Sequence, residues 1–205
     1  MTIKVIIFDV DWVLLQVPHY FSQEIEKRGH KNAVTVLGDF YKNKNPLCAE
    51  WKAEAIQLIV PYLEKIWWNK WAEEYFKEQF EFEKKYLNTP LISIISKIQK
   101  QGIKCYLWTD QEKNRAQYLL DWMEFWEWLD WHFISCNIWA KKSLPEFWYH
   151  VKKDLLNDWI NKDEIVFFDD LQSNIDVANT EGIEAFLFTD IEEFEKDLVA
   201  LWIKK

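Results

Sequence analysis

Five short runs of apolar residues, rich in β-branched and aromatic side chains, recur along the chain. The first is IKVIIF, and the other four follow in the second half of the chain as IKCYLW, HFISC, EIVFF and EAFLF (residues 3–8, 103–108, 132–136, 164–168 and 184–188). Near-continuous apolar runs of this length are typical of strands buried on both faces. Helical patterns separate the later runs. Strands that alternate with helices in this way predict an α/β fold of three layers, with a parallel sheet covered by helices on both faces.

Capping residues mark the ends of several predicted helices. Thr89, which precedes a proline, has the character of an N-cap, and Asp190 with Glu193 resembles a capping box. Gly102 and Gly182 stand where a helix needs a left-handed residue after its last turn. These signals support the alternation of strands and helices.

The pattern changes between residues 16 and 91. This region consists of long amphipathic stretches such as AEAIQLIV and KWAEEYFKEQFEFEKKYL, without a convincing strand. It is too long for a simple crossover between two parallel strands. We therefore predict a small helical cap at 16–91, inserted into a core formed by residues 1–15 and 92–205.

Composition and charge limit the class of protein. The chain has 205 residues, of which 49% are hydrophobic, and a formal net charge of −9. That charge opposes a phosphate backbone, so we expect neither nucleic acid nor an anionic membrane as a partner. The sequence shows no leader pattern and no stretch of about 18 uncharged apolar residues, which predicts a cytoplasmic protein. The three cysteines are widely spaced and offer neither a disulfide framework nor a metal motif.

Polar side chains follow each of the first four predicted strands. They are Asp9 and Asp11, then Thr109 and Asp110, then Lys141, Lys142 and Ser143, and finally Asp169, Asp170 and Asn174. Any one of them alone would be an ordinary loop residue, but the carboxyl ends of parallel strands meet at one edge of a sheet. Carboxylates gathered there repel one another unless a hard cation such as Mg²⁺ neutralises them. A lysine and a hydroxyl beside that cation would complete a site for a phosphoryl group.

The segments FDVDWVL, YLWTD, SCNIWAKKSLPEF and IVFFDDLQSNIDVA, taken in this order, resemble the four motifs of the haloacid-dehalogenase-like (HAD) hydrolase superfamily. The resemblance is to the phosphatases that carry a small helical cap after the first motif, and it spans residues 3 to about 190. It implies a three-layer, Rossmann-like parallel sheet with an inserted α-helical cap. It also implies a Mg²⁺-dependent phosphomonoester hydrolase whose partner is a small phosphorylated metabolite. The oligomeric state is not indicated.

The resemblance also implies a role for each motif residue. Asp9 would be the nucleophile that forms an aspartyl-phosphate, and Asp11 would be the general acid and then the general base. Thr109 would hydrogen-bond the phosphoryl oxygens, Asp110 would lie beside them, and Lys142 would balance the developing charge. Dehalogenating relatives lack a carboxylate at the place of Asp11, so its presence favours phosphate esters.

A metal site follows from the same motifs. Asp170 would bind Mg²⁺ together with the carboxylate of Asp9 and the backbone carbonyl of Asp11. Asp169 and Asn174 would support these ligands or act as weaker ones.

Two alternatives stay open at this stage. One is a phosphomutase of the same superfamily, in which a returning phosphate replaces water. The other is a catalytically silent phosphate-binding or scaffold protein whose site is obstructed by Trp12.

Of the two neighbouring lysines, Lys141 is the weaker candidate for the catalytic role.

The tryptophan and glycine contents are abnormal. The chain has 14 Trp and 4 Gly, although ordinary usage would give roughly 14 Gly in a chain of this length. Trp12 and Trp139 both stand where the resembling phosphatases commonly carry glycine, and an indole at Trp12 is expected to strain the turn or obstruct the phosphate site. We hypothesise that many of these tryptophans are glycines in the natural protein, through a UGA codon that its source reads as glycine.

Overall fold

A parallel sheet of five strands organises the computed structural model, which describes residues 2–157 and 159–204. The strands are β1 (Val5–Phe8), β2 (Lys104–Thr109), β3 (Trp131–Ile134), β4 (Ile165–Asp169) and β5 (Glu184–Leu187), in the order β3-β2-β1-β4-β5. Each of the apolar runs forms one strand, so the predicted α/β fold is confirmed. Phe8 at the end of β1 is in register with Leu107 and Phe168 of its two neighbours. Residues that follow these positions therefore share one edge of the sheet.

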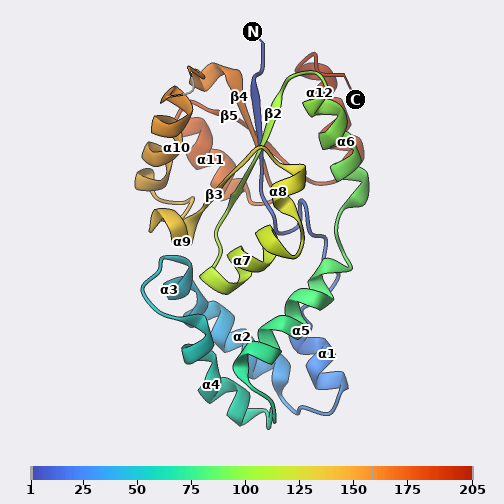
Figure 1. Cartoon of the computed structure of the whole chain (residues 1–205), viewed down its shortest axis with the longest axis vertical. Coiled ribbons are helices and arrows are strands. Elements are labelled where there is room, and N and C mark those ends of the chain that lie inside the picture. The colour runs from blue at the N-terminus through green and yellow to red at the C-terminus, as the bar shows by residue number, and fades with distance from the viewer. Residues whose placement is uncertain (1, 158, 205) are drawn as a thin grey trace.

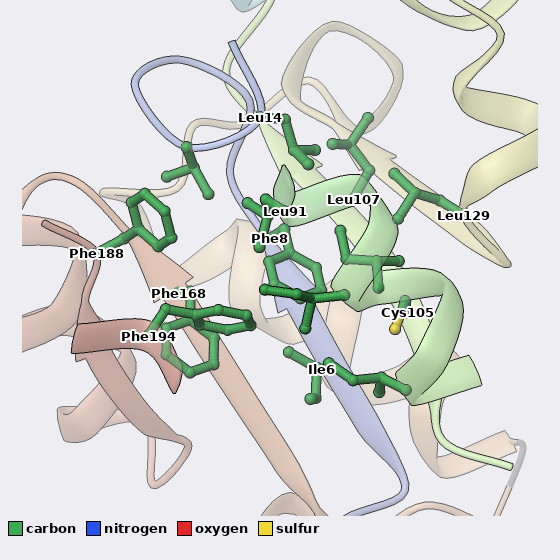
Figure 2. Close-up of a cluster of buried hydrophobic side chains, with 14 of the residues drawn as sticks. Ile6, Phe8, Leu14, Leu91, Cys105, Leu107, Leu129, Phe168, Phe188 and Phe194 are labelled. Carbon is green, nitrogen blue, oxygen red and sulfur yellow. The ribbon is translucent and has the colours of Figure 1, made fainter. Parts of the chain in front are cut away.

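Helices cover both faces of the sheet. On one face, α6 (Thr89–Gln99), α7 (Lys113–Asp121), α8 (Phe125–Trp128) and α12 (Ile191–Ala200) pack over a core that includes Ile6, Phe8 and Phe168. Figure 2 shows Leu91 of α6 and Phe194 of α12 close to these strand side chains.

The other face has its own buried core. Helices α10 (Pro145–Asn157) and α11 (Gln172–Thr180) pack there against Val5, Ile7 and Phe167. Successive residues of β1 thus enter different cores, as the alternation of side chains along a strand requires. Two short elements complete this part of the chain, α9 (Ser135–Ile138) and a 3-10 turn at Lys162–Glu164.

A group of helices lies between β1 and α6. It consists of α1 (Phe21–Lys27), α2 (Ala33–Asn43), α3 (Asn45–Ala49), α4 (Ala55–Lys65) and α5 (Ala72–Lys84). These helices share a separate apolar core, with Phe40 and Tyr75 among its fully buried side chains. Figure 1 shows them grouped beneath the carboxyl edge of the sheet. Leu91 packs in the sheet core instead, so residues 89–91, the end of the predicted insertion, lie with the sheet.

The helix ends largely match the sequence signals. Gly102 and Gly182 have φ of 85° and 81°, and Asp190 accepts a hydrogen bond from the Glu193 backbone N–H at 2.9 Å. Thr89 is the first helical residue rather than the cap, because Asn88 accepts from the Leu91 N–H, 3.3 Å away. Within residues 2–157 and 159–204, every helix is too short or too polar to span a bilayer.

Helices α4 and α12 are among those that end at a tryptophan in the left-handed conformation. Trp67 follows α4 with φ 57°, and Trp202 follows α12 with φ 61°. Both indoles are exposed, by 85% and 93%. Contacts of the rings therefore do not offset the energetic cost of the backbone conformation. For an L-residue this conformation costs about 1–2 kcal/mol.

We therefore expect Trp67→Gly and Trp202→Gly each to stabilise the fold. The relief of strain, less the entropy that glycine gains in the unfolded chain, should raise the free energy of unfolding by roughly 0.5–1 kcal/mol per site. Urea titration followed by circular dichroism measures the change. Trp148→Ala is the matched control, because Trp148 is fully buried and its truncation should cost about 3–5 kcal/mol. A loss of stability from the two glycine variants would contradict the prediction.

Candidate active site

A buried lysine forms ion pairs with two aspartates at the carboxyl edge of the sheet. The Lys142 Nζ lies 2.9 Å from the Asp9 Oδ1 and 2.6 Å from the Asp169 Oδ2. Asp9 directly follows β1, where its N–H donates to the Phe168 carbonyl at 3.0 Å, and Asp169 is the last residue of β4. Burial lowers the pKa of Lys142, but the charges of Asp9 and Asp169 outweigh burial and raise that pKa. The lysine therefore stays protonated and compensates the carboxylates.

Asp169 is held in a fixed orientation. The Asn174 Nδ2 donates to both of its carboxylate oxygens, at 2.9 and 3.0 Å, and the Leu171 N–H donates to Oδ1 at 2.9 Å. Asn174 is buried in the first turn of α11. The turn from β4 into α11 thus fixes the side chain that Lys142 binds.

Three carboxylates gather beside this lysine. One oxygen from each of Asp9, Asp169 and Asp170 lies within 4.8 Å of the other two. Burial, followed by the charge of Asp169, raises the pKa of Asp170 to about 6. Burial also raises the pKa of Asp9, an effect that Lys142 opposes and Asp169 increases. Three acidic side chains beside one ammonium leave excess negative charge, which a hard divalent cation can neutralise.

The end of β2 completes this edge. Thr109 is buried, and its Oγ1 accepts a hydrogen bond from the Gln111 Nε2 at 2.9 Å. The Asp110 Oδ1 accepts from the Lys142 backbone N–H at 3.0 Å, which ties the loop after β3 to β2. Burial raises the pKa of Asp110, and the charge of Lys142 opposes that rise.

Asp11 is bound by an arginine. The Arg115 Nη1 and Nη2 donate to the two carboxylate oxygens at 2.8 and 2.6 Å, and the Gln111 Nε2 donates at 2.8 Å. Burial raises the pKa of Asp11, but the charge and hydrogen bonds of Arg115 outweigh it and lower that pKa. The Arg115 Nε donates to the Glu83 Oε2 at 2.9 Å, so the same guanidinium contacts α5 of the helical insertion.

The structure places the predicted site residues at the edge where β1, β2 and β4 end. The set is Asp9, Asp11, Thr109, Asp110, Lys142, Asp169, Asp170 and Asn174. Lys142 is at the centre of this set. The neighbouring Lys141 instead pairs with Glu50 at the end of α3, with its Nζ 3.0 Å from the Oε1.

Sequence reasoning missed Gln111, Arg115 and Glu83. Arg115 carried a usable signal, because it is one of two arginines in the chain and stands six residues after Thr109. Glu83 carried none, because it lies among several glutamates of one amphipathic helix.

Solved structures share this fold. One is a HAD family enzyme from Bacteroides thetaiotaomicron in complex with magnesium and inorganic phosphate, which is 15% identical, has a TM-score of 0.71 and aligns over 94% of this chain and 98% of its own. Another is a predicted HAD-like hydrolase from Porphyromonas gingivalis, 13% identical, with a TM-score of 0.73 and full coverage of both chains. An L-2-haloacid dehalogenase from Xanthobacter autotrophicus is 12% identical, with a TM-score of 0.65 and coverage of 100% and 85%.

No family model and no curated protein matches the sequence. At these identities the structural likeness establishes the fold, and the chain has the fold of the HAD superfamily. The resemblance indicated by the four motifs is thus confirmed as a shared fold.

Removal of the central ammonium should destabilise the protein strongly. In Lys142→Met the buried Asp9 and Asp169 lose their counter-ion, which should lower the free energy of unfolding by about 3 kcal/mol. The loss should shrink as the pH falls, because burial raises the pKa of Asp9 and protonation removes its uncompensated charge. Urea titrations at several pH values measure both effects.

Lys141→Met is the matched control for this substitution. Its ion pair with Glu50 is partly exposed, so its loss should cost less than about 1 kcal/mol. Equal costs for the two lysines would contradict the central role given to Lys142.

Proposed function

We propose that the protein is a Mg²⁺-dependent phosphomonoester hydrolase that acts on a small phosphorylated metabolite. The observation that carries this proposal is the buried Asp9 carboxylate, held 2.9 Å from the Lys142 Nζ beside two further aspartates. A nucleophilic carboxylate next to a fixed cation is the arrangement that attack on a phosphate ester requires. A protein of the same fold that was solved with magnesium and inorganic phosphate supports the choice of ligands.

The acidic cluster fits a magnesium ion. Its oxygen donors are the type that Mg²⁺ prefers, and one lysine does not balance the charges of Asp9, Asp169 and Asp170. Asp9, Asp170 and the backbone carbonyl of Asp11 would hold the ion, with Asp169 as a supporting or weaker ligand. The ion would supply charge neutralisation at the phosphoryl oxygens.

Each residue of the site then has a defined task. An Asp9 oxygen attacks phosphorus, so an Asp9 oxygen–phosphorus bond forms while the bond from phosphorus to the ester oxygen breaks. Asp11 gives a proton to the leaving oxygen, and then takes one from the water that attacks the aspartyl-phosphate. For the first of these steps the Asp11 carboxyl has to leave its ion pair with Arg115, because that ion pair lowers its pKa. Thr109 donates to a phosphoryl oxygen, and the Lys142 ammonium stabilises the charge on the group in transfer. Asp110 lies beside the phosphate and holds Lys142 in place by accepting a hydrogen bond from the Lys142 backbone N–H.

The helical insertion is proposed to act as a cap. Its helix α5 reaches the site through the ion pair between Glu83 and Arg115. Closure over the substrate would exclude water from the aspartates and select the leaving group.

The first experiment is phosphate release from a panel of small phosphate esters. We expect hydrolysis that EDTA abolishes and Mg²⁺ restores, because the acidic cluster needs its cation. Asp9→Asn should lower the rate on the order of a thousandfold or more, whereas Lys141→Met should retain it. The panel is run on the chain with Trp12 and Trp139 and on a Trp12→Gly/Trp139→Gly version.

The outcomes separate the competing functions. Chloride release from 2-chloropropionate without hydrolysis of any ester would replace the phosphatase by a dehalogenase. Transfer of phosphate between two phosphosugars, without free phosphate, would identify a phosphomutase. Folded protein of both versions that binds phosphate but turns nothing over would favour a silent binding protein.

A further inference from the structure

Six of the 14 tryptophans have a left-handed backbone. They are Trp12, Trp51, Trp67, Trp139, Trp159 and Trp202, with φ between 57° and 65°. All other non-glycine residues in the described part of the chain contribute two such positions, Asn32 and Glu124. Asparagine tolerates this conformation because its short polar side chain can bond locally, whereas a bulky aromatic residue does not.

Four of these tryptophans end helices through one hydrogen-bonding motif. After α4, the Trp67 N–H donates to the Glu64 carbonyl at 3.1 Å, and the next N–H, of Trp68, donates to the Leu63 carbonyl at 3.0 Å. This pair of bonds defines the Schellman motif, whose left-handed position glycine fills in most helices. The same pair of hydrogen bonds follows α3 at Trp51 and α12 at Trp202. After α10, the N–H of the residue that follows Trp159 makes the second bond of this pair.

Two glycines of this chain occupy the same position of the same motif. Gly29 follows α1 and Gly182 follows α11, with φ of 100° and 81°. The Gly182 N–H donates to Asn179, and the next N–H donates to Ala178, both at 3.0 Å. The tryptophans thus stand where this protein otherwise uses glycine.

At three of these positions the side chain does not account for tryptophan. The indoles of Trp67, Trp159 and Trp202 are exposed by 85%, 87% and 93%. Trp148 differs in each respect, because it lies inside α10, is fully buried and donates from Nε1 to the Lys142 carbonyl at 2.8 Å.

The two remaining positions flank the site. Trp12 directly follows Asp11, and Trp139 ends α9 three residues before Lys142. Their φ values are 61° and 65°. Both turns lie within three residues of a site residue, Asp11 or Lys142, and a residue without Cβ adopts a left-handed turn freely.

We propose that the natural protein carries glycine at all six positions, because its source decodes UGA as glycine. UGA differs in a single base from the tryptophan codon UGG and from the glycine codon GGA, so a reassigned UGA produces this exchange when it is read as tryptophan. The glycine deficit and the left-handed tryptophans then have the same origin.

The test is peptide mass spectrometry on the protein isolated from its source, together with the codons of its gene. We expect UGA codons and glycine residues at the six positions, and a UGG codon with tryptophan at Trp148. Tryptophan at the helix ends, or UGG codons there, would overturn the proposal.

Discussion

The contact of one buried ammonium with two buried carboxylates organises the site. Lys142 lies between Asp9 and Asp169, which stand at the ends of two neighbouring strands. Without the lysine, the two carboxylates would present like charges to each other in a low dielectric. The contact requires the loop after β3 to reach across the end of β2 toward β1 and β4. The hydrogen bond from the Lys142 N–H to Asp110 holds that loop in place. The same lysine thus compensates charge and ties together the ends of separate strands.

The order of the strands explains why residues so distant in sequence meet. Because β1 lies between β2 and β4, the residues after these three strands share one edge, and the chain reverses its direction of winding there. The helical insertion leaves the sheet directly after β1, so α5 can contact the site through Glu83 and Arg115. Fold and site are therefore consequences of one arrangement, in which buried apolar strands carry polar residues at their carboxyl ends.

Sequence reasoning predicted what depends on local pattern. The apolar runs predicted the strands, and the polar residues after them, together with the resemblance of the four motifs, singled out Asp9, Lys142 and Asp170. It could not give Arg115 or Glu83, because their role depends on how α5 and α7 approach each other across the interior. It also placed residues 89–91 with the insertion, since an amphipathic pattern does not say which of two cores a helix face enters. The hypothesis that Trp12 and Trp139 are glycines in the natural protein came from their positions in the motifs. The left-handed backbone at four further tryptophans can be seen only in the structure.

The proposed hydrolysis requires that Asp9 becomes covalently phosphorylated. The most direct measurement is to quench the protein during turnover of a phosphate ester, reduce it with borohydride and sequence its peptides by mass spectrometry. An aspartyl-phosphate is reduced to homoserine, so we expect homoserine at position 9 only when ester and Mg²⁺ are both present. Turnover with Asp9 unmodified, or homoserine at Asp11 or Asp169 instead, would contradict it.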